Sequence, residues 1–352
     1  MTTSRASGAV GRVSGGAPCC GASLAEREIH PPARQLLRDQ PTKPLRPRVG
    51  IQQTGANEVD HGVELLVGGF EIPSGARTPA YRPVDERTYR ALLRHYAYDR
   101  TPLDAQVVER TTTQDWTRET IHIAGPWRDR TVLHLYLPLR GARPLQTVLF
   151  APGTNTFFEA ALAAETERIM GAHVKAGRAV LAVLMKGMVG RPWETGRAAP
   201  APSSVQFRQE LVSRATELRR ALDYLETRRD VDRTRLAYVA VSWGAGSRLP
   251  FAAVEPRFGS LVLVGGGFDE RFTRTLPEVN SVNFAPRIRA PTLLLNGRYD
   301  EEHPWDACAL PLWRLLREPK RLAVVEGGHV PPAEARVPVI NGWLDETLGR
   351  VR

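Results

Sequence analysis

The chain has 352 residues, of which 42% are hydrophobic, and this length is sufficient for one large α/β core or two small ones. Its formal net charge of +10 comes from 44 Arg and four Lys that are scattered among acidic residues. Because no compact basic run with interleaved aromatic residues occurs, the charge supports nucleic-acid binding only weakly and no nucleic-acid partner is expected, although the charge would favour an anionic substrate.

Residues 1–80 are rich in Gly, Pro, Ala and Arg and show no sustained hydrophobic period. This composition predicts a poorly ordered leader, followed by one domain over residues 81–352. The N-terminal run MTTSRASGAVGRVSGG lacks the apolar stretch of a signal peptide, and no segment is apolar enough to span a bilayer. We therefore expect a soluble, cytoplasmic protein without a membrane partner. Three cysteines, two of them adjacent, do not make a disulfide framework.

The domain begins with a predicted helix over residues 84–99. The segments ETIHIAG and TVLHLYLP follow as alternating strand-like runs separated by Gly125-Pro126, which predicts an antiparallel hairpin. The nearly continuous apolar run QTVLFAPG then predicts a strand that is buried on both faces.

Strands and helices alternate from this point to the C-terminus. The predicted strands are AVLAVLM, LAYVAV, SLVLVGG, PTLLLNG and RLAVVEGG. Helices are predicted over about residues 157–176, through the apolar spacing between Phe207 and Leu225, after Ser242, over ACALPLWRLLRE, and through Trp343 and Leu348. Antiparallel strands followed by repeated βα units predict an α/β fold with a mostly parallel sheet and helices on both faces.

Ser242 stands at the carboxyl end of a predicted strand, in the motif A-x-S-x-G with Ala240 and Gly244. A serine on a tight strand-to-helix turn holds its oxygen clear of the sheet, and small residues two positions away relieve crowding there. We therefore treat Ser242 as a candidate nucleophile. The alternative is a serine that only caps the next helix.

A serine nucleophile needs a base, and the base needs an orienting acid. Asp300 lies just past the strand PTLLLNG, and His329 lies just past RLAVVEGG. The order Ser, Asp, His on three loops at one sheet edge predicts a catalytic triad. Other nearby acids remain possible, namely Glu301, Glu302 and Asp306, and His303 is interpreted as a rim residue.

An attacked carbonyl also requires hydrogen-bond donors for its developing oxyanion. One predicted donor is the backbone N–H of Trp243, the residue after the candidate nucleophile. The second is expected from FAPGTNTFF, where Gly153 permits close backbone approach and either Thr154 or Asn155 donates. An ordinary turn with Thr154 or Asn155 as helix cap is compatible with this role.

Asn155 and two further sets of residues are candidates for substrate binding. Phe157, Phe158 and Trp243 could line an acyl pocket, although apolar residues in such places are more often core. The loop over residues 186–204 is long enough to form a small lid, in which Lys186, Arg191 and Trp193 could contact an acidic or aromatic substrate.

From about Tyr89 to Leu348 the chain resembles the α/β-hydrolase superfamily, and more narrowly the dienelactone-hydrolase and acetyl-esterase-like domains that occur alone or appended to bacterial serine/threonine protein kinases. The resemblance is carried by YAYDRTPLDAQV, QTVLFAPGTN, GRAVLAVLMKG, ALDYLETRRDVDRTRLAYVAVSWGA, APRIRAPTLLLNGRYDEEHP and VVEGGHVPP. It implies an eight-stranded, mostly parallel sheet, the triad Ser242, Asp300 and His329, and Trp243 and Thr154 as oxyanion donors. Ala240 and Ala245 depart from it, because glycines are usual there.

These residues favour a metal-free serine hydrolase that cleaves small-molecule carboxylic esters through an acyl-enzyme. A peptidase or amidase with the same triad is an alternative, and a catalytically weak binding module is another. Because the sequence has no dinucleotide fingerprint, P-loop or His/Cys metal cluster, no cofactor or metal is expected. The oligomeric state and the natural substrate are left open.

Overall fold

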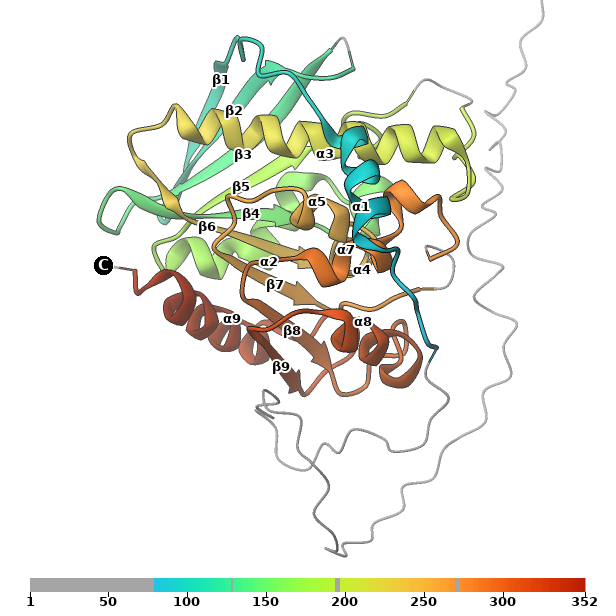
Figure 1. Ribbon diagram of the computed structural model, residues 1–352. Coiled ribbons are helices and arrows are strands. Elements are labelled where there is room, and N and C mark those ends of the chain that lie inside the picture. Colours follow the sequence, from blue (N-terminus) through green and yellow to red (C-terminus); the bar gives the residue numbers. More distant parts are fainter. Residues whose placement is uncertain (1–78, 128, 194–196, 270–272, 352) are drawn as a thin grey trace, which may run out of the picture. The chain divides into compact units, whose positions relative to one another are not determined.

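The computed structural model describes residues 79–127, 129–193, 197–269 and 273–351 (Figure 1). The predicted leader, residues 1–80, lies almost wholly outside them. Within the described residues the sheet has nine strands in the order β1-β2-β3-β5-β4-β6-β7-β8-β9. The strands are β1 (Gln106–Thr112), β2 (Trp116–Ala124), β3 (Arg130–Pro138), β4 (Leu145–Ala151), β5 (Ala179–Leu184), β6 (Val231–Val241), β7 (Ser260–Val264), β8 (Thr292–Gly297) and β9 (Lys320–Val325).

The sheet is antiparallel at one end and parallel through the rest. β1, β2, β3 and β5 pair antiparallel in succession, whereas β4 pairs parallel with both β5 and β6, and β6 to β9 continue in parallel. This arrangement confirms the predicted α/β class and the predicted hairpin. The parallel strands are buried along nearly their whole length, as their continuous apolar sequences require.

The expectation of eight strands was wrong by one. The additional strand is β1, an edge strand with the sequence QVVERTT in which every residue is exposed. A strand that buries neither face has no alternating apolar pattern, so periodicity gives no signal for it. It is recognised only by its antiparallel pairing with β2.

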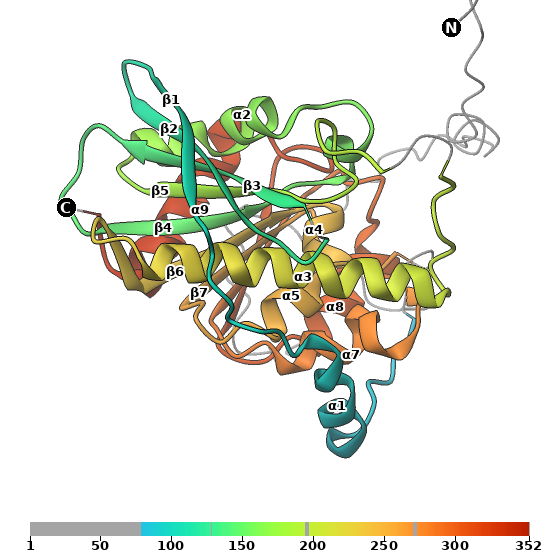
Figure 2. The same ribbon diagram turned by 90° about the horizontal axis from the view of Figure 1, so that it is seen from above.

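Helices cover both faces of the sheet, as Figure 2 shows. The helical segments are α1 (Glu86–Leu92), η2 (Leu93–Tyr96), η3 (Thr154–Phe157), α2 (Leu162–Lys175), α3 (Val205–Glu226), α4 (Trp243–Gly246), α5 (Leu249–Ala253), η4 (Pro277–Val279), α7 (Ser281–Phe284), η5 (Ala285–Arg287), η6 (Trp305–Ala309), α8 (Leu310–Leu315) and α9 (Ala333–Leu348). None of the helices in the described part of the chain is long and apolar enough to cross a membrane.

Two apolar clusters form the core, one on each face. Val148 and Phe150 of β4 pack in the cluster that contains most buried apolar residues of α2 and those of α9. Leu149, between them, packs in the other cluster, which contains those of α3, α5 and α8. Successive side chains of a strand point to opposite faces, so each buried strand contributes to both clusters.

Helix boundaries differ from the sequence predictions in two places. The helix expected over residues 157–176 is a short 3₁₀ turn, η3, followed after a gap by α2. The helix expected over ACALPLWRLLRE begins as a π-helical turn, η6, and is α-helical only over α8. The long helix α3 matches its predicted spacing, and Ser204 caps it by accepting a hydrogen bond from the Phe207 N–H at 3.1 Å.

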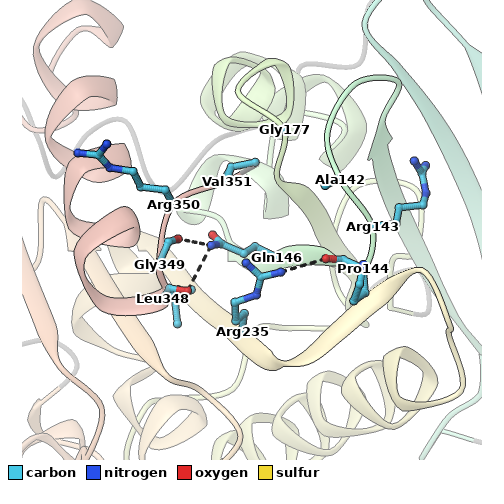
Figure 3. A pocket seen from close by; sticks show the side chains of 10 residues that line it. All are labelled: Ala142, Arg143, Pro144, Gln146, Gly177, Arg235, Leu348, Gly349, Arg350 and Val351. Carbon is cyan, nitrogen blue, oxygen red and sulfur yellow. Dashed lines mark hydrogen bonds between the residues drawn. The ribbon is translucent and has the colours of Figure 1, made fainter.

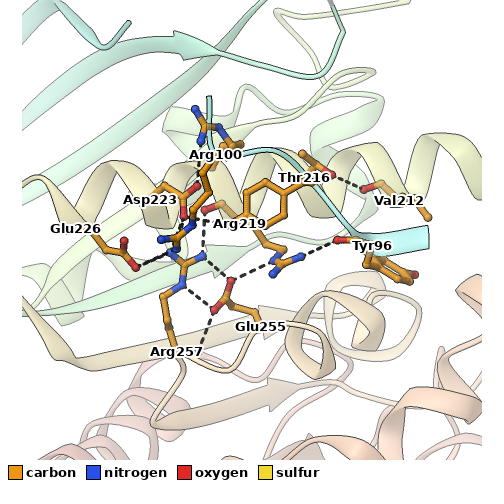
Figure 4. Close-up of polar contacts among 11 residues, drawn as sticks. Tyr96, Arg100, Val212, Thr216, Arg219, Asp223, Glu226, Glu255 and Arg257 are labelled. Atoms are coloured by element: carbon orange, nitrogen blue, oxygen red, sulfur yellow. Dashed lines mark hydrogen bonds and ion pairs between the residues drawn. The ribbon is translucent and has the colours of Figure 1, made fainter. Parts of the chain in front are cut away.

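An ion-pair network joins α3 to the segments before β1 and before β7 (Figure 4). Arg257 donates to Asp223 at 2.8 Å, to Glu226 at 2.9 Å and to Glu255 at 2.6 Å. Arg100 reaches Asp223 at 3.0 Å from the segment before β1. The network therefore fixes α3 against segments that are distant in sequence.

Candidate active site

Ser242 occupies a sharp turn between β6 and α4. Its backbone has φ 55° and ψ −118°, a conformation that few non-glycine residues adopt and that costs about 1–3 kcal/mol. A Cβ atom on Gly244 would lie 2.5 Å from the carbonyl oxygen of Ala151, so no larger residue fits there without a backbone shift. The turn thus has the geometry expected of a nucleophile elbow, with Ala240 fully buried beneath it.

His329 lies on the loop that follows β9. Its Nε2 atom is 2.7 Å from the Oγ atom of Ser242. Gly265, which has a φ of +59°, follows β7 and faces His329, and a Cβ there would lie 2.4 Å from the His329 carbonyl oxygen. The histidine loop therefore approaches the neighbouring strand end closely, which holds the imidazole beside the serine.

Asp300 lies on the loop that follows β8. Its two carboxylate oxygens are 2.9 and 3.0 Å from Nδ1 of His329. Oδ1 also accepts the backbone N–H groups of Glu302 at 3.1 Å and His303 at 2.8 Å. The Glu302 side chain is 71% exposed and lies 3.6 Å from the other imidazole nitrogen, Nε2. The geometry therefore favours Asp300 as the group that orients the imidazole.

The register of the sheet explains why these three loops meet. Val241 of β6 is level with Val264 of β7, which is level with Leu295 of β8. The last residue of β8, Gly297, is level with the last residue of β9, Val325. Because parallel strands end at one edge, the loops after β6, β8 and β9 converge there.

The pair Asp300–His329 shifts the acidity of both groups. Burial alone would raise the pKa of Asp300, but hydrogen bonds from His329 and the His303 backbone lower it below its ordinary value. Burial alone would lower the pKa of His329, but the Asp300 carboxylate, with a contribution from Glu302, raises it. An ionised Asp300 therefore stabilises the protonated form of His329.

His303 is not the rim residue that its place in the sequence suggested. It is 7% exposed, and its Nδ1 atom lies 2.7 Å from the Gly265 carbonyl oxygen. Its ring stands edge-on to the His329 ring, with centroids 4.8 Å apart. Burial lowers the pKa of His303, so the neutral form is favoured beside His329. No pattern in the sequence around His303 predicts that its ring is buried against His329.

Asp300, His303 and His329 are also the described residues whose ligand atoms lie near enough to share a metal ion, all within 4.8 Å of one another. The hydrogen bonds of the site already use Nδ1 of both imidazoles. Nε2 of His329 faces Ser242. Both ring nitrogens of His329 therefore already have a partner, Nδ1 with Asp300 and Nε2 with Ser242, as in a serine–histidine–aspartate relay.

The loop after β4 lies directly against the nucleophile. A Cβ on Gly153 would be 3.3 Å from Cβ of Ser242. Thr154, which is exposed, begins η3 at this point. The Asn155 side-chain oxygen accepts the Thr156 N–H at 3.1 Å, so the amide stabilises the turn. The predicted donors Thr154 and Trp243 thus belong to the two backbone segments that flank Ser242.

Phe157 and Trp243 pack against each other beside the elbow. Their ring centroids are 5.2 Å apart at an interplanar angle of 81°. Phe157 is partly buried and Trp243 is buried, whereas Phe158 is 75% exposed and points to solvent. Phe157 and Trp243, but not Phe158, are therefore the aromatic candidates that pack beside the nucleophile.

The loop over residues 186–204 is anchored to the body of the domain. Lys186 and Arg191 both bind the Asp129 carboxylate, at 3.2 and 2.7 Å. Arg191 also forms an ion pair with the fully buried Glu217 of α3. Trp193 packs on Trp127, with ring centroids 4.9 Å apart. The described contacts of Lys186 and Trp193 are thus with other protein side chains, and their role toward a substrate stays a prediction.

A separate cavity of about 560 Å³ lies at the other end of the parallel strands from Ser242, and its lining residues are drawn in Figure 3. It is lined by residues at the start of β4, including Pro144 and Gln146, together with Arg235 of β6 and the residues that follow α9. Gln146 bonds the Leu348 carbonyl oxygen there at 3.4 Å. This cavity lies at the amino ends of the parallel strands and is distinct from the Ser242 site.

No protein-family model matches the sequence, and no curated protein is significantly similar to it. Three esterases of known structure resemble the fold. The acetyl xylan esterase from Paenibacillus sp. R4 has a TM-score of 0.60 and 17% identity, over 77% of this chain and 97% of that chain. Acetyl xylan esterase 1 from Thermoanaerobacterium sp. JW/SL YS485 has a TM-score of 0.59 and 16% identity, over 76% and 96%. A cold-adapted esterase from an Arctic intertidal metagenomic library has a TM-score of 0.51 and 19% identity, over 68% and 98%.

These similarities extend over nearly the whole length of each esterase. The strained turn at Ser242 stands at the strand end where this architecture places its ligand site. The chain has the α/β-hydrolase fold.

Proposed function

We propose that the protein is a serine hydrolase that cleaves carboxylic esters. The observation that carries the proposal is the continuous relay from Asp300 to His329 Nδ1 at 2.9 Å and from His329 Nε2 to Ser242 Oγ at 2.7 Å. A serine hydroxyl is a weak nucleophile unless a base takes its proton as it attacks. The relay supplies that base and fixes its tautomer.

In the acylation step the Ser242 oxygen attacks the ester carbonyl while Nε2 of His329 accepts its proton. The negative charge develops on the former carbonyl oxygen, next to the backbone N–H groups of Trp243 and Thr154, which are its proposed donors. When the tetrahedral intermediate collapses, the protonated His329 gives its proton to the leaving alcohol. Asp300 stabilises the imidazolium throughout.

In the deacylation step a water molecule replaces the alcohol. His329 accepts a proton from this water as its oxygen attacks the acyl-enzyme carbonyl, and the new tetrahedral intermediate then releases Ser242. His329 returns the proton to the serine oxygen, and the carboxylic acid leaves. Two steps with lower barriers thereby replace one direct hydrolysis.

The two acetyl xylan esterases support ester cleavage, whereas a putative dipeptidyl aminopeptidase IV from Bacteroides ovatus has a similar fold, with a TM-score of 0.53 and 16% identity over 67% of this chain and 36% of that chain. The same relay serves amide bonds, so the proposal needs a direct comparison of both substrate types. Cytoplasmic location and the absence of a cofactor remain predictions from the sequence.

The first experiment is intact-mass analysis after incubation with a fluorophosphonate probe, which labels an activated serine without knowledge of the substrate. We expect one adduct on the wild type and none on Ser242→Ala or His329→Ala. Ser247→Ala is the matched control, because this serine lies just after α4 and is not in the relay. Well-folded wild type without an adduct would contradict the proposal and favour a binding module.

The second experiment separates esters from amides. We expect turnover of p-nitrophenyl acetate that is lost in Ser242→Ala, and much slower turnover of an aminoacyl p-nitroanilide. Faster cleavage of the anilide would replace the esterase proposal with a peptidase.

A further inference from the structure

Arg248 is a fully buried cation for which the described residues provide no hydrogen-bond partner. It lies between α4 and α5, six residues after Ser242, and its side chain is 0% exposed. Its Nε, Nη1 and Nη2 atoms are all buried, and none has a hydrogen-bond partner in the part of the chain that the structure describes. Burial strongly lowers the pKa of this guanidinium, with a further contribution from Arg214.

In the part of the chain that the structure describes, the other buried arginines each have a polar partner. Arg178 forms an ion pair with Asp345, and Arg336 donates to the Pro331 carbonyl oxygen at 2.9 Å. Arg214 donates to the Lys186 carbonyl oxygen at 2.9 Å and pairs with Glu210 at 3.3 Å. Burial of a charge is unfavourable unless hydrogen bonds compensate it. The unpaired donors of Arg248 are therefore unusual within this protein.

Aromatic rings surround this guanidinium. Its central carbon lies 3.4 Å from the ring centroid of Trp243, 4.8 Å from that of Phe157 and 5.9 Å from that of Phe251. Cation–π attraction offsets part of the desolvation, but it leaves the N–H donors unused. Phe157, the last residue of η3, is the one of these three rings that is partly exposed.

Two of these rings connect Arg248 to the reacting atoms. Trp243 directly follows Ser242, and Phe157 closes the turn that starts at Thr154. The guanidinium of Arg248 therefore packs against the residue that follows the nucleophile and against the turn after β4. Its planar fork of N–H groups matches the two oxygens of a carboxylate.

We propose that Arg248 binds a carboxylate of the substrate, so that the preferred substrates are esters that carry a carboxylate near the scissile bond. The inference rests on the proposed function of Ser242. The rotation of Phe157 away from the guanidinium would let the carboxylate reach the free donors. The ion pair formed then compensates for the buried charge, which neutral esters cannot do.

The first test measures binding without turnover. Succinate should raise the thermal unfolding temperature of the wild type in a concentration-dependent way, whereas the neutral diamide succinamide should not. Arg248→Met should lose the response to succinate, and Arg235→Met, at the other end of the parallel strands (Figure 3), should keep it. An equal response of wild type and Arg248→Met, or no response of the wild type, would overturn the proposal.

The second test measures specificity. For a carboxylate on the acyl side, p-nitrophenyl hemisuccinate is compared with p-nitrophenyl butyrate; for one on the leaving group, acetylsalicylate is compared with phenyl acetate. In Arg248→Met, kcat/KM for the preferred charged ester should fall about 10- to 100-fold, the usual effect of losing a charged hydrogen bond. Its neutral counterpart should change less than about twofold, and equal losses on both would contradict the assignment.

These tests separate two kinds of failure. Succinate binding that depends on Arg248 in a protein without esterase activity would refute the proposed function and retain the anion site. Esterase activity without any preference for a charged ester would support the proposed function and refute the carboxylate site at Arg248. Arg248→Met should also unfold in urea at or above the wild-type midpoint, because it removes an unpaired buried charge.

Discussion

Ser242 shows at the scale of one residue how the turn stores strain. It and Asp104 are the two non-glycine residues with positive φ in the described part of the chain. Glycine adopts such a conformation without the steric penalty that Ser and Ala pay. Ser242→Gly should therefore have a free energy of unfolding about 1 kcal/mol higher than Ser242→Ala in urea denaturation. Both variants lack the nucleophile, so equal stabilities would show that the turn is unstrained.

The pH dependence of catalysis belongs to His329. The imidazole acts as base only when unprotonated, and the Asp300 carboxylate raises its pKa above the ordinary 6.5 although burial opposes this. We therefore expect kcat/KM for p-nitrophenyl acetate to rise with pH, to reach half its maximum above pH 6.5 and to level off at higher pH.

Glu302 provides the control for this profile. Its carboxylate contributes to the raised pKa of His329 from 3.6 Å but makes no contact with Nδ1. Glu302→Gln should move the midpoint to lower pH and leave the high-pH plateau near the wild-type value. An unchanged midpoint would show that solvent screens this charge, and a wild-type midpoint at or below 6.5 would contradict the role of Asp300.

At the scale of the elements, the close contact between α4 and β4 depends on Gly244. Its hydrogen faces the Ala151 and Pro152 carbonyl oxygens, which a Cβ would meet at 2.5 and 3.1 Å. Gly244→Ala should destabilise the protein by about 1–3 kcal/mol, since the backbone must shift. It should also lower fluorophosphonate labelling, because the elbow moves relative to the loop after β4.

Gly342 in α9 is the matched comparison, because a Cβ at this helical position meets nothing within 4 Å. Gly342→Ala should raise the free energy of unfolding by up to about 1 kcal/mol through helix propensity alone. Urea denaturation of both variants checks the pair. If both substitutions changed the free energy of unfolding equally, the close contact at Gly244 would not contribute to stability.

The elements were predictable to the extent that they bury a periodic apolar face. The core strands and α3 gave strong signals because each buries apolar residues along most of its length. β1 gave none because all its residues are exposed. The sequence predicted one helix where the structure has η3 followed by α2. The break between them includes backbone hydrogen bonds from the Phe158 and Ala160 N–H groups to the Asn155 carbonyl oxygen, and such bonds leave no pattern of apolar residues in the sequence.

At the scale of the whole molecule, buried charge links distant segments. Glu255 accepts from Nε of Arg257 at 2.7 Å and pairs with Arg219 at 3.4 Å, and its side chain is 2% exposed. Glu255→Ala removes this partner from both guanidinium groups and should destabilise the protein by about 1.5–3 kcal/mol, because Arg257 keeps Asp223 and Glu226 as partners. Thermal or urea unfolding measures the loss.

The exposed pair of Arg321 and Glu346, at 2.7 Å, provides the contrast. Glu346→Ala should change the free energy of unfolding by less than about 1 kcal/mol, because solvent screens the pair and both side chains lose entropy in forming it. If the two glutamate variants were equally stable, the network in Figure 4 would not hold α3 in place.

The sequence by itself determined the α/β class, the succession of core strands and helices along the chain, and the candidates Ser242, Asp300 and His329. These depend on local patterns, namely apolar runs and polar residues just past strand ends, which are readable along the chain. The tertiary structure decided which acid faces His329, the burial of His303, and the enclosure of Arg248 by Trp243 and Phe157. Such contacts join side chains from separate loops, and the distance between two loops depends on the packing of the whole sheet, which no local pattern records.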